Sequence, residues 1–168
     1  AGHQLHAYVY VAKCVSGSGG GARCAEPQIV RLENGHPLEV YGNPPTLIHD
    51  WDGDGDLDLI LFDFMNSITF FENIGTRTGP VYTSGRLMHD SDGARLCGDL
   101  CLPEATAADW DGDGKLDIFI GEEDARVGWF RNTGRLEKGM PVFERVKYFR
   151  QRADELNFGV LNTPAAVD

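Results

Sequence analysis

The sequence predicts an all-β fold built on a repeated unit. Asp50, Asp109 and Asp168 are evenly spaced along the chain, which defines a 59-residue period, and closely similar motifs surround the first two of these aspartates. The segments between turns are short and rich in Val, Ile, Phe, Tyr and Trp, and they are separated by Gly, Asn, Pro or Asp. This composition is typical of strands and hairpins rather than helices.

Four strands are expected in the first complete repeat. A short strand enters the aspartate loop 50–58, and the apolar segment 57–64 (LDLILFDF) leaves it. An aromatic-pair strand follows at 67–75 (SITFFENIG), and a Pro-Val strand follows at 80–88 (PVYTSGRLM).

The same strands recur further along the chain. Segments 116–123 (LDIFIGEE), 126–134 (RVGWFRNTG) and 141–149 (PVFERVKYF) match the three segments of the first repeat, and Phe71 and Phe130 are separated by the same period. The recurring aromatic pairs, and the tryptophans that follow Asp50 and Asp109, are expected to pack in the core because they occupy equivalent strand and loop positions.

The N-terminal region is interpreted as a third version of the last two strands. Segments 5–14 (LHAYVYVAKC) and 26–33 (EPQIVRLE) correspond to the aromatic-pair and Pro-Val strands, shifted by a couple of residues and joined by an altered loop.

Four strands per repeat, with a period between about 40 and 60 residues, are the sequence signature of β-propeller blades. The expected organisation is one incomplete array of antiparallel blades, with outer strands and a connector at 1–49, blades at 50–108 and 109–167, and the start of another at 168. Propellers usually close with about 4–8 blades. The expected partners are therefore the remaining blades, from the same parent protein, another chain or other copies.

The two aspartate loops predict calcium binding. Each has aspartate at positions 1, 3, 5 and 9 and glycine at position 6. Calcium takes about six to eight oxygen ligands, and glycine permits the sharp turn that lets position 7 offer its carbonyl. Position 12 holds Leu61 or Ile120 instead of the glutamate of an EF-hand. The expected ligands of two structural Ca²⁺ ions, with Asp56 and Lys115 acting through backbone carbonyls, are Asp50, Asp52, Asp54, Asp56, Asp58, Asp109, Asp111, Asp113, Lys115 and Asp117.

The net charge and the hydropathy of the sequence argue against nucleic-acid binding and against a membrane-spanning helix. The formal net charge of −11 disfavours nucleic acid, because phosphates would be repelled. No apolar run approaches the length of about 18 residues that a membrane-spanning helix needs.

The four cysteines form two pairs that are close in sequence. Cys14 and Cys24 bracket a glycine-rich loop, and Cys97 and Cys101 bracket the short segment GDL. Two disulfides would suit an extracellular, periplasmic or cell-surface protein. A zinc site and free thiols are the alternatives, although these spacings are not a familiar zinc pattern.

The two DWDGDG-x-LD loops, the repeat period and the FFENIGT and WFRNTG strands resemble the FG-GAP/VCBS repeats of calcium-binding β-propellers. The resemblance covers essentially the whole chain at the level of repeat architecture. Such repeats occur in integrin α-chain heads, fungal sugar-binding lectins and bacterial secreted propellers, including some polysaccharide lyases. The resemblance implies the fold and the metal, whereas activity differs widely within the family.

Long connectors between each Pro-Val strand and the next aspartate loop are expected to lie on one face of the ring and to carry any ligand site. The candidates for ligand binding are Arg95, Arg150 and Arg152, and those for catalysis are Tyr41, His36, His49, His89, Arg95 and Arg150.

Three functions are compatible with these residues. The first is a secreted module that binds carbohydrate or another extracellular ligand. The second is a polysaccharide lyase, in which an arginine neutralises a uronate carboxylate and a histidine or tyrosine removes the C5 proton. The third is an adhesion or scaffold propeller that binds protein. The first is preferred, because histidines and arginines beside acidic residues are more often structural than catalytic.

Overall fold

The computed structural model describes residues 6–16, 22–42, 44–101, 103–150 and 164–165. Within these ranges the chain forms strands joined by turns and bends, and there is no helix that is long and apolar enough to cross a membrane. The sheets are antiparallel: two have four strands, one is a separate hairpin, and three are small pairs near the N-terminus. The prediction of an all-β chain is therefore confirmed.

The first four-stranded sheet is a meander in which each strand pairs with its neighbours in sequence. Its order is β10-β9-β8-β7. Every residue of β8 is buried, as expected for a strand that is covered on both faces. The strands are β7 (Thr46–His49), β8 (Asp58–Phe62), β9 (Ile68–Phe71) and β10 (Arg86–Leu87).

The second four-stranded sheet has the same topology, and its β12 is likewise buried throughout. Every residue pair of β7–β8 and of β8–β9 recurs one period later: Asp58 pairs with His49, for example, and Asp117 pairs with Ala108. The strands are β11 (Glu104–Ala108), β12 (Asp117–Gly121), β13 (Val127–Phe130) and β16 (Lys147–Tyr148).

The Pro-Val segments differ from the expectation, because only their last residues join the four-stranded sheets. In the second repeat, Pro141 and Val142 belong to β15 (Met140–Phe143), which pairs with β14 (Asn132–Glu137) as a separate hairpin. Two residues, Lys138 and Gly139, connect these strands with φ of 54° and 78°. Positive φ at both positions is the signature of a type I′ turn, which favours a hairpin. The equivalent positions in the first repeat are Gly79 and Pro80, and proline cannot adopt positive φ.

The N-terminal segments form three small strand pairs. Segments 5–14 and 26–33 were interpreted as versions of the aromatic-pair and Pro-Val strands; β2 and β5, which lie in them, pair with each other, while β1 pairs with part of the connector. The pairs are β1 (His6–Tyr8) with β6 (Glu39–Tyr41), β2 (Tyr10–Val11) with β5 (Gln28–Ile29), and β3 (Cys14–Ser16) with β4 (Ala22–Cys24).

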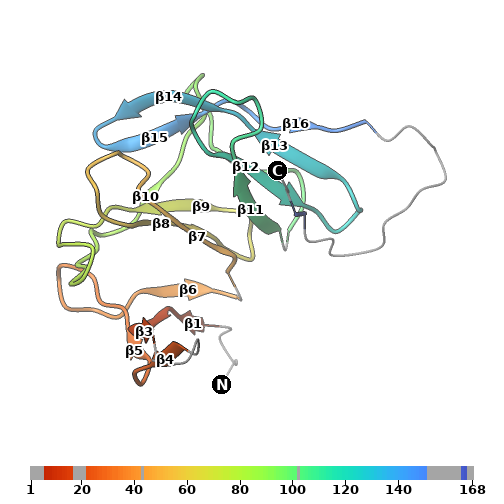
Figure 1. The fold of residues 1–168 in the computed structure, drawn as a ribbon. Coiled ribbons are helices and arrows are strands. Elements are labelled where there is room, and N and C mark those ends of the chain that lie inside the picture. The colour runs from red at the N-terminus through yellow and green to blue at the C-terminus, as the bar shows by residue number, and fades with distance from the viewer. Residues whose placement is uncertain (1–5, 17–21, 43, 102, 151–163, 166–168) are drawn as a thin grey trace.

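The chain forms three layers: the N-terminal strand pairs, the first four-stranded sheet and the second four-stranded sheet. They stack in chain order, with the first four-stranded sheet in the middle (Figure 1). One face of this sheet packs against the N-terminal layer, in a core that contains Leu59, Leu61, Phe71, Val30 and Leu38. The opposite face packs against the second sheet, in a core that contains Ile60, Phe62, Phe70, Ile118, Ile120 and Phe130. Alternation along β8 thus supplies both cores, since successive side chains point to opposite faces.

Candidate metal centres in the aspartate loops

Each aspartate loop connects the first two strands of a four-stranded sheet and gathers three carboxylates. Within each group, carboxylate oxygens lie within 4.8 Å of one another. Two oxygens bound to one calcium ion at about 2.4 Å can be no more than about 4.8 Å apart, so the spacing fits a single cation. The groups are Asp50, Asp52 and Asp58 in the first loop, and Asp109, Asp111 and Asp113 in the second.

The first aspartate of each loop organises the turn through backbone hydrogen bonds. Oδ1 of Asp50 accepts a hydrogen bond from the Gly53 amide at 2.8 Å, and Oδ2 accepts one from the Gly55 amide at 3.0 Å. Asp109 accepts the corresponding bond from the Gly114 amide at 2.9 Å. These bonds hold the loop closed around the carboxylates.

The aspartate at position 9 ties each loop to the segment that follows the third strand of its sheet. Oδ2 of Asp58 accepts a hydrogen bond from the Trp51 amide at 3.0 Å, and Oδ1 accepts one from the Asn73 amide at 2.9 Å. In the second sheet, Oδ1 of Asp117 accepts the Asn132 amide at 2.7 Å. Both aspartates are buried. Asp58 joins the metal-spaced group of its loop, whereas Asp113 takes that place in the second loop.

The first loop concentrates negative charge that no cation of the described residues offsets. Burial raises the pKa of Asp58 to about 6, and the charges of Asp52 and Asp56 add to this rise, while its two backbone hydrogen bonds oppose it. Burial also raises the pKa of Asp56, and Asp54 and Asp52 raise it further. Among the ion pairs of the described residues, none joins a lysine or arginine to loop 50–58.

One oxygen of this loop is buried without a satisfactory partner. Oδ1 of Asp56 accepts no hydrogen bond of standard geometry from the described residues, although the Asn73 side chain is close enough to lower the pKa of Asp56. A buried carboxylate oxygen without a hydrogen-bond partner lowers the stability of the fold unless an opposite charge lies nearby. The first loop therefore fits a bound cation.

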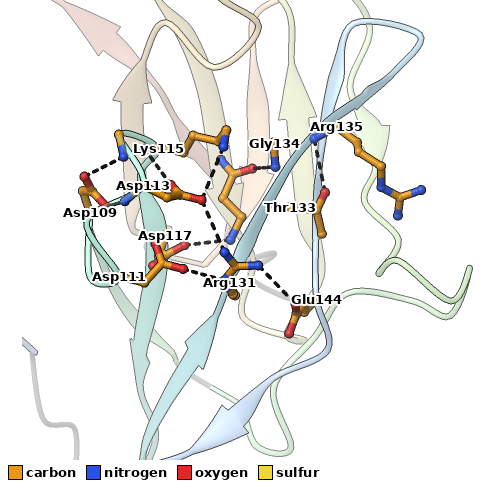
Figure 2. A network of polar contacts seen from close by, with 12 residues as sticks. Asp109, Asp111, Asp113, Lys115, Asp117, Arg131, Thr133, Gly134, Arg135 and Glu144 are labelled. Atoms are coloured by element: carbon orange, nitrogen blue, oxygen red, sulfur yellow. Dashed lines mark hydrogen bonds and ion pairs between the residues drawn. The ribbon is translucent and has the colours of Figure 1, made fainter.

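The second loop contains one cation of its own, Lys115, and a second, Arg131, reaches it from the end of β13 (Figure 2). Nε of Arg131 lies 2.5 Å from Oδ2 of Asp111, and its Nη2 lies 3.4 Å from Oδ2 of Asp113. Nη1 of the same arginine lies 3.6 Å from Glu144, and Lys115 Nζ lies 3.3 Å from Asp113. The hydrogen bond from Arg131 lowers the pKa of Asp111.

Two substitutions between the repeats account for this difference. Lys115 occupies the position of Asp56, and Arg131 occupies the position of Glu72. The Lys115 side chain also lies against Gly134, whose φ is 68° and where a Cβ would collide with it. The alignment of the two repeats predicted Lys115 as a backbone ligand but did not identify Arg131 as a partner of the loop carboxylates. The change from Glu72 to Arg131 between the repeats is visible in the sequence.

The histidine candidates lie in separate turns and strand ends. The His36 amide donates to Asn34 within an exposed turn, and His49 packs edge-on to Trp51 with ring centroids 5.3 Å apart. His89 is exposed and forms a backbone bridge with Arg95.

The tyrosine and arginine candidates are similarly dispersed. The Tyr41 ring packs edge-on to Phe64, and Arg95 donates to Ser67 Oγ. Arg150 is exposed after β16, and Arg152 lies outside the described residues. The contacts of the described side chains define no common catalytic site.

One candidate, Arg95, lines a pocket of about 250 Å³. The sequence did not predict that the residues of this pocket lie together. Arg145 lies in the same lining and approaches the buried Asp90 at 3.4 Å. The remaining lining residues are Asp90, Leu96, Cys97, Gly98, Asp99, Phe130 and Val146.

The fully buried Glu122 fixes one wall of this pocket, and sequence reasoning missed it. Its Oε1 accepts hydrogen bonds from the Asp99 amide at 2.7 Å and from the Tyr148 hydroxyl at 2.8 Å. Nη2 of Arg126 lies 3.1 Å from its Oε2. A Cβ at Gly98 would collide with Glu122, so the connector requires glycine at this point.

The two cysteine pairs differ in state. Cys14 and Cys24 form a disulfide across β3 and β4. Cys97 and Cys101 are free thiols, which is one of the alternatives that the sequence left open for this pair: Cys97 is half-buried beside the Glu122-bound loop, and Cys101 is exposed. Among the described residues, neither belongs to a group with metal-ligand spacing.

Comparison of the chain with models of known protein families, with curated proteins and with solved structures finds no match.

Proposed function

We propose that this protein is a calcium-stabilised β-propeller module, with one structural Ca²⁺ ion in each aspartate loop. The observation that carries the proposal is the convergence of three carboxylates in each loop with the spacing that one cation requires. The matching strand registers of the two sheets and their face-to-face stacking support a blade-like arrangement.

The ion would be structural, because the loops lie between strands and hold them together. In the first loop, Asp50, Asp52 and Asp58 would supply side-chain oxygens, and neutralisation of their mutual repulsion would stabilise the turn between β7 and β8. All-oxygen ligation and the number of available oxygens favour calcium over magnesium, which keeps several waters and demands octahedral geometry.

Isothermal titration calorimetry with calcium tests the metal assignment. The wild-type chain is expected to bind two ions, and Asp50→Asn and Asp109→Asn are each expected to remove one. Asp92→Asn makes the same charge change at an exposed site outside both loops and is expected to leave the stoichiometry at two. A wild-type chain that does not bind calcium, or loop variants that still bind two ions, would refute the assignment.

We further propose that the module binds an acidic carbohydrate in an extracellular setting, at the pocket beside Arg95 and Arg145. Arg95 and Arg145 share this concave lining with Asp90 and Asp99. Arg145 pairs with Asp90, so the Arg95 guanidinium is the group that suits the carboxylate of a uronate residue, since guanidinium groups form paired hydrogen bonds with carboxylates. The Cys14–Cys24 disulfide supports an oxidising compartment. No histidine or tyrosine is among the residues described in this lining, so binding is favoured over the lyase reaction.

Titration with uronic-acid oligosaccharides tests the ligand. Saturable binding is expected for the wild type and is expected to weaken at least tenfold in Arg95→Gln, because one charge-assisted contact contributes roughly 1.5–3 kcal/mol. Arg77→Gln, a change at an exposed loop outside the pocket, serves as the control. Equal affinity in all three proteins would exclude this pocket as the site.

A further inference from the structure

An exposed turn of the N-terminal layer contains Asn34 and Gly35, and Asn34 is the only asparagine in the sequence that glycine follows. Both residues are exposed, and Gly35 has a φ of 81°. Apart from the two chain neighbours of Gly35, nothing lies within 4 Å of the position that a Cβ on this residue would occupy. The peptide bond between Asn34 and Gly35 is therefore open to water.

The Asn34 side chain is folded over the Gly35 peptide. Its Oδ1 accepts a hydrogen bond from the His36 amide at 2.9 Å, which is the arrangement of an Asx turn. The ring that this bond closes contains both the side-chain carbonyl carbon of Asn34, Cγ, and the amide nitrogen of Gly35. The His36 amide also polarises the Asn34 side-chain carbonyl, as a donor in an oxyanion hole does. Both features favour attack of the Gly35 nitrogen on Cγ.

We propose that Asn34 is a site of spontaneous deamidation, with water as the only co-reactant. The Gly35 amide loses its proton to solvent base, and its nitrogen forms a bond to Cγ of Asn34. The Cγ–Nδ2 bond breaks, and ammonia leaves with a proton from solvent. Water then hydrolyses the cyclic imide at either of its two carbonyl carbons. The products are aspartate in the normal main chain and isoaspartate, in which the main chain runs through Cγ.

One hydrogen bond must open before the Gly35 nitrogen can attack. The Gly35 amide donates to the Leu32 carbonyl at 2.8 Å. Because the turn lies on the surface, it can open locally without unfolding the core. Asn66 provides a contrast within the same chain: it is buried, and its Oδ1 accepts the Gly98 amide at 3.2 Å. Asn66 is therefore expected to keep its amide.

The isoaspartyl product alters the contact between the N-terminal layer and the first sheet. It adds one carbon to the main chain inside the turn, and two backbone hydrogen bonds span this point, Leu32 to His36 and Gly35 to Leu32. The same turn holds the first sheet through the Glu33 amide, which donates to the Tyr82 carbonyl at 2.7 Å. Isoaspartate is therefore expected to weaken this contact. The inference goes beyond the proposed function, because the turn lies outside the aspartate loops and the Arg95 pocket.

Peptide mass spectrometry of the full chain, incubated in calcium at neutral and at mildly alkaline pH, tests the proposal. The native wild type is expected to change from amide to acid at Asn34 and to remain unchanged at Asn66. The reaction is expected to be faster at alkaline pH, because the attacking nitrogen must lose a proton. Labelling by an isoaspartate methyltransferase measures the isoaspartyl product.

Two variants test the chemistry of the turn. Asn34→Gln keeps an amide but would have to close a larger ring, so it is expected not to react. Gly35→Ala is expected to react more slowly by roughly tenfold, because a Cβ hinders the nitrogen and restricts the main chain. Wild type unfolded in urea shows the reactivity of the same sequence without the turn.

Three results would overturn the proposal: an Asn34 amide that reacts in urea but persists in the native chain, equal reaction at Asn66 in the native chain, or no reaction in either state. Asn34→Asp carries the charge of the product on a normal main chain. Aged wild type is expected to unfold at lower urea concentration than this variant. Equal midpoints would overturn the inferred effect on the sheet contact.

Discussion

At the scale of single residues, two substitutions make the aspartate loops unequal. Glu72 and Asp56 of the first repeat become Arg131 and Lys115 in the second. A calcium ion bound in the second loop as proposed would have to displace the Arg131 guanidinium from Asp111 and Asp113, whereas in the first loop it would only relieve carboxylate repulsion.

Replacement of Arg131 by glutamine is expected to raise the calcium affinity of the second loop, because the guanidinium would no longer compete with the ion for Asp111 and Asp113. Calorimetry on the Asp50→Asn background isolates this site. Arg135→Gln, on β14 and outside the ion pairs of the loop carboxylates, controls for the general loss of positive charge. A decrease in affinity would show that Arg131 supports the site.

The pH dependence of the calcium-free protein is expected to report on Asp58. Its pKa is about 6 in the folded state against 3.8 for an unperturbed carboxyl, so the folded state binds the proton more tightly. Protonation therefore stabilises the fold fully below pH 3.8, and this contribution is lost as the pH rises through about 6.

In chelator, the wild type is accordingly expected to lose stability between about pH 4 and pH 7 relative to Asp58→Asn, which has no proton to release. Urea unfolding of both proteins across this range measures the difference. Parallel pH profiles would contradict the raised pKa.

At the scale of elements, the hairpin of β14 and β15 distinguishes the two repeats. Its turn requires positive φ at Lys138 and Gly139, and the first repeat has Gly79 and Pro80 at the equivalent positions. Local turn chemistry therefore explains why one Pro-Val segment forms a continuous two-stranded hairpin, whereas the other makes only isolated antiparallel bridges, Asn73 with Tyr82 and Thr76 with Gly79.

Gly139→Ala is expected to lower the free energy of unfolding by roughly 1–2 kcal/mol, the cost of a left-handed conformation for a residue with a Cβ. Lys138→Asn is the matched control and is expected to be neutral, since asparagine tolerates positive φ. Denaturant unfolding measures both. An unchanged stability of Gly139→Ala would argue against the turn assignment.

At the scale of the whole molecule, the two four-stranded sheets share one core. Phe70 of the first sheet and Phe130 of the second belong to the same buried cluster, and both are fully buried. The sheets are therefore expected to unfold together rather than as independent units.

Phe70→Ala is expected to cost about 3–5 kcal/mol and to shift a single transition seen by both fluorescence and circular dichroism. Leu87→Ala, at an exposed position on β10, is expected to cost less than about 0.5 kcal/mol. Separate transitions in the Phe70 variant would show that the sheets are not coupled through this core.

The amino-acid sequence by itself determined the all-β class, the repeating register of the three inner strands and the two acidic loops, because alternation, turn residues and ligand spacing are local signals. The tertiary structure decided which carboxylates meet, since Arg131 reaches the second loop from a later part of the chain. It also decided the pairing of the N-terminal strands and the state of Cys97 and Cys101.

Trp51 and Trp110 illustrate the boundary between the two sources of information. They occupy the same position in nearly identical loops, and a common packing role was expected for both. One is buried and the other is 56% exposed, because a neighbouring sheet covers the first, whereas no further sheet of the described residues covers the second. Burial depends on what lies across the face of a sheet, and a local motif carries no information about that neighbour.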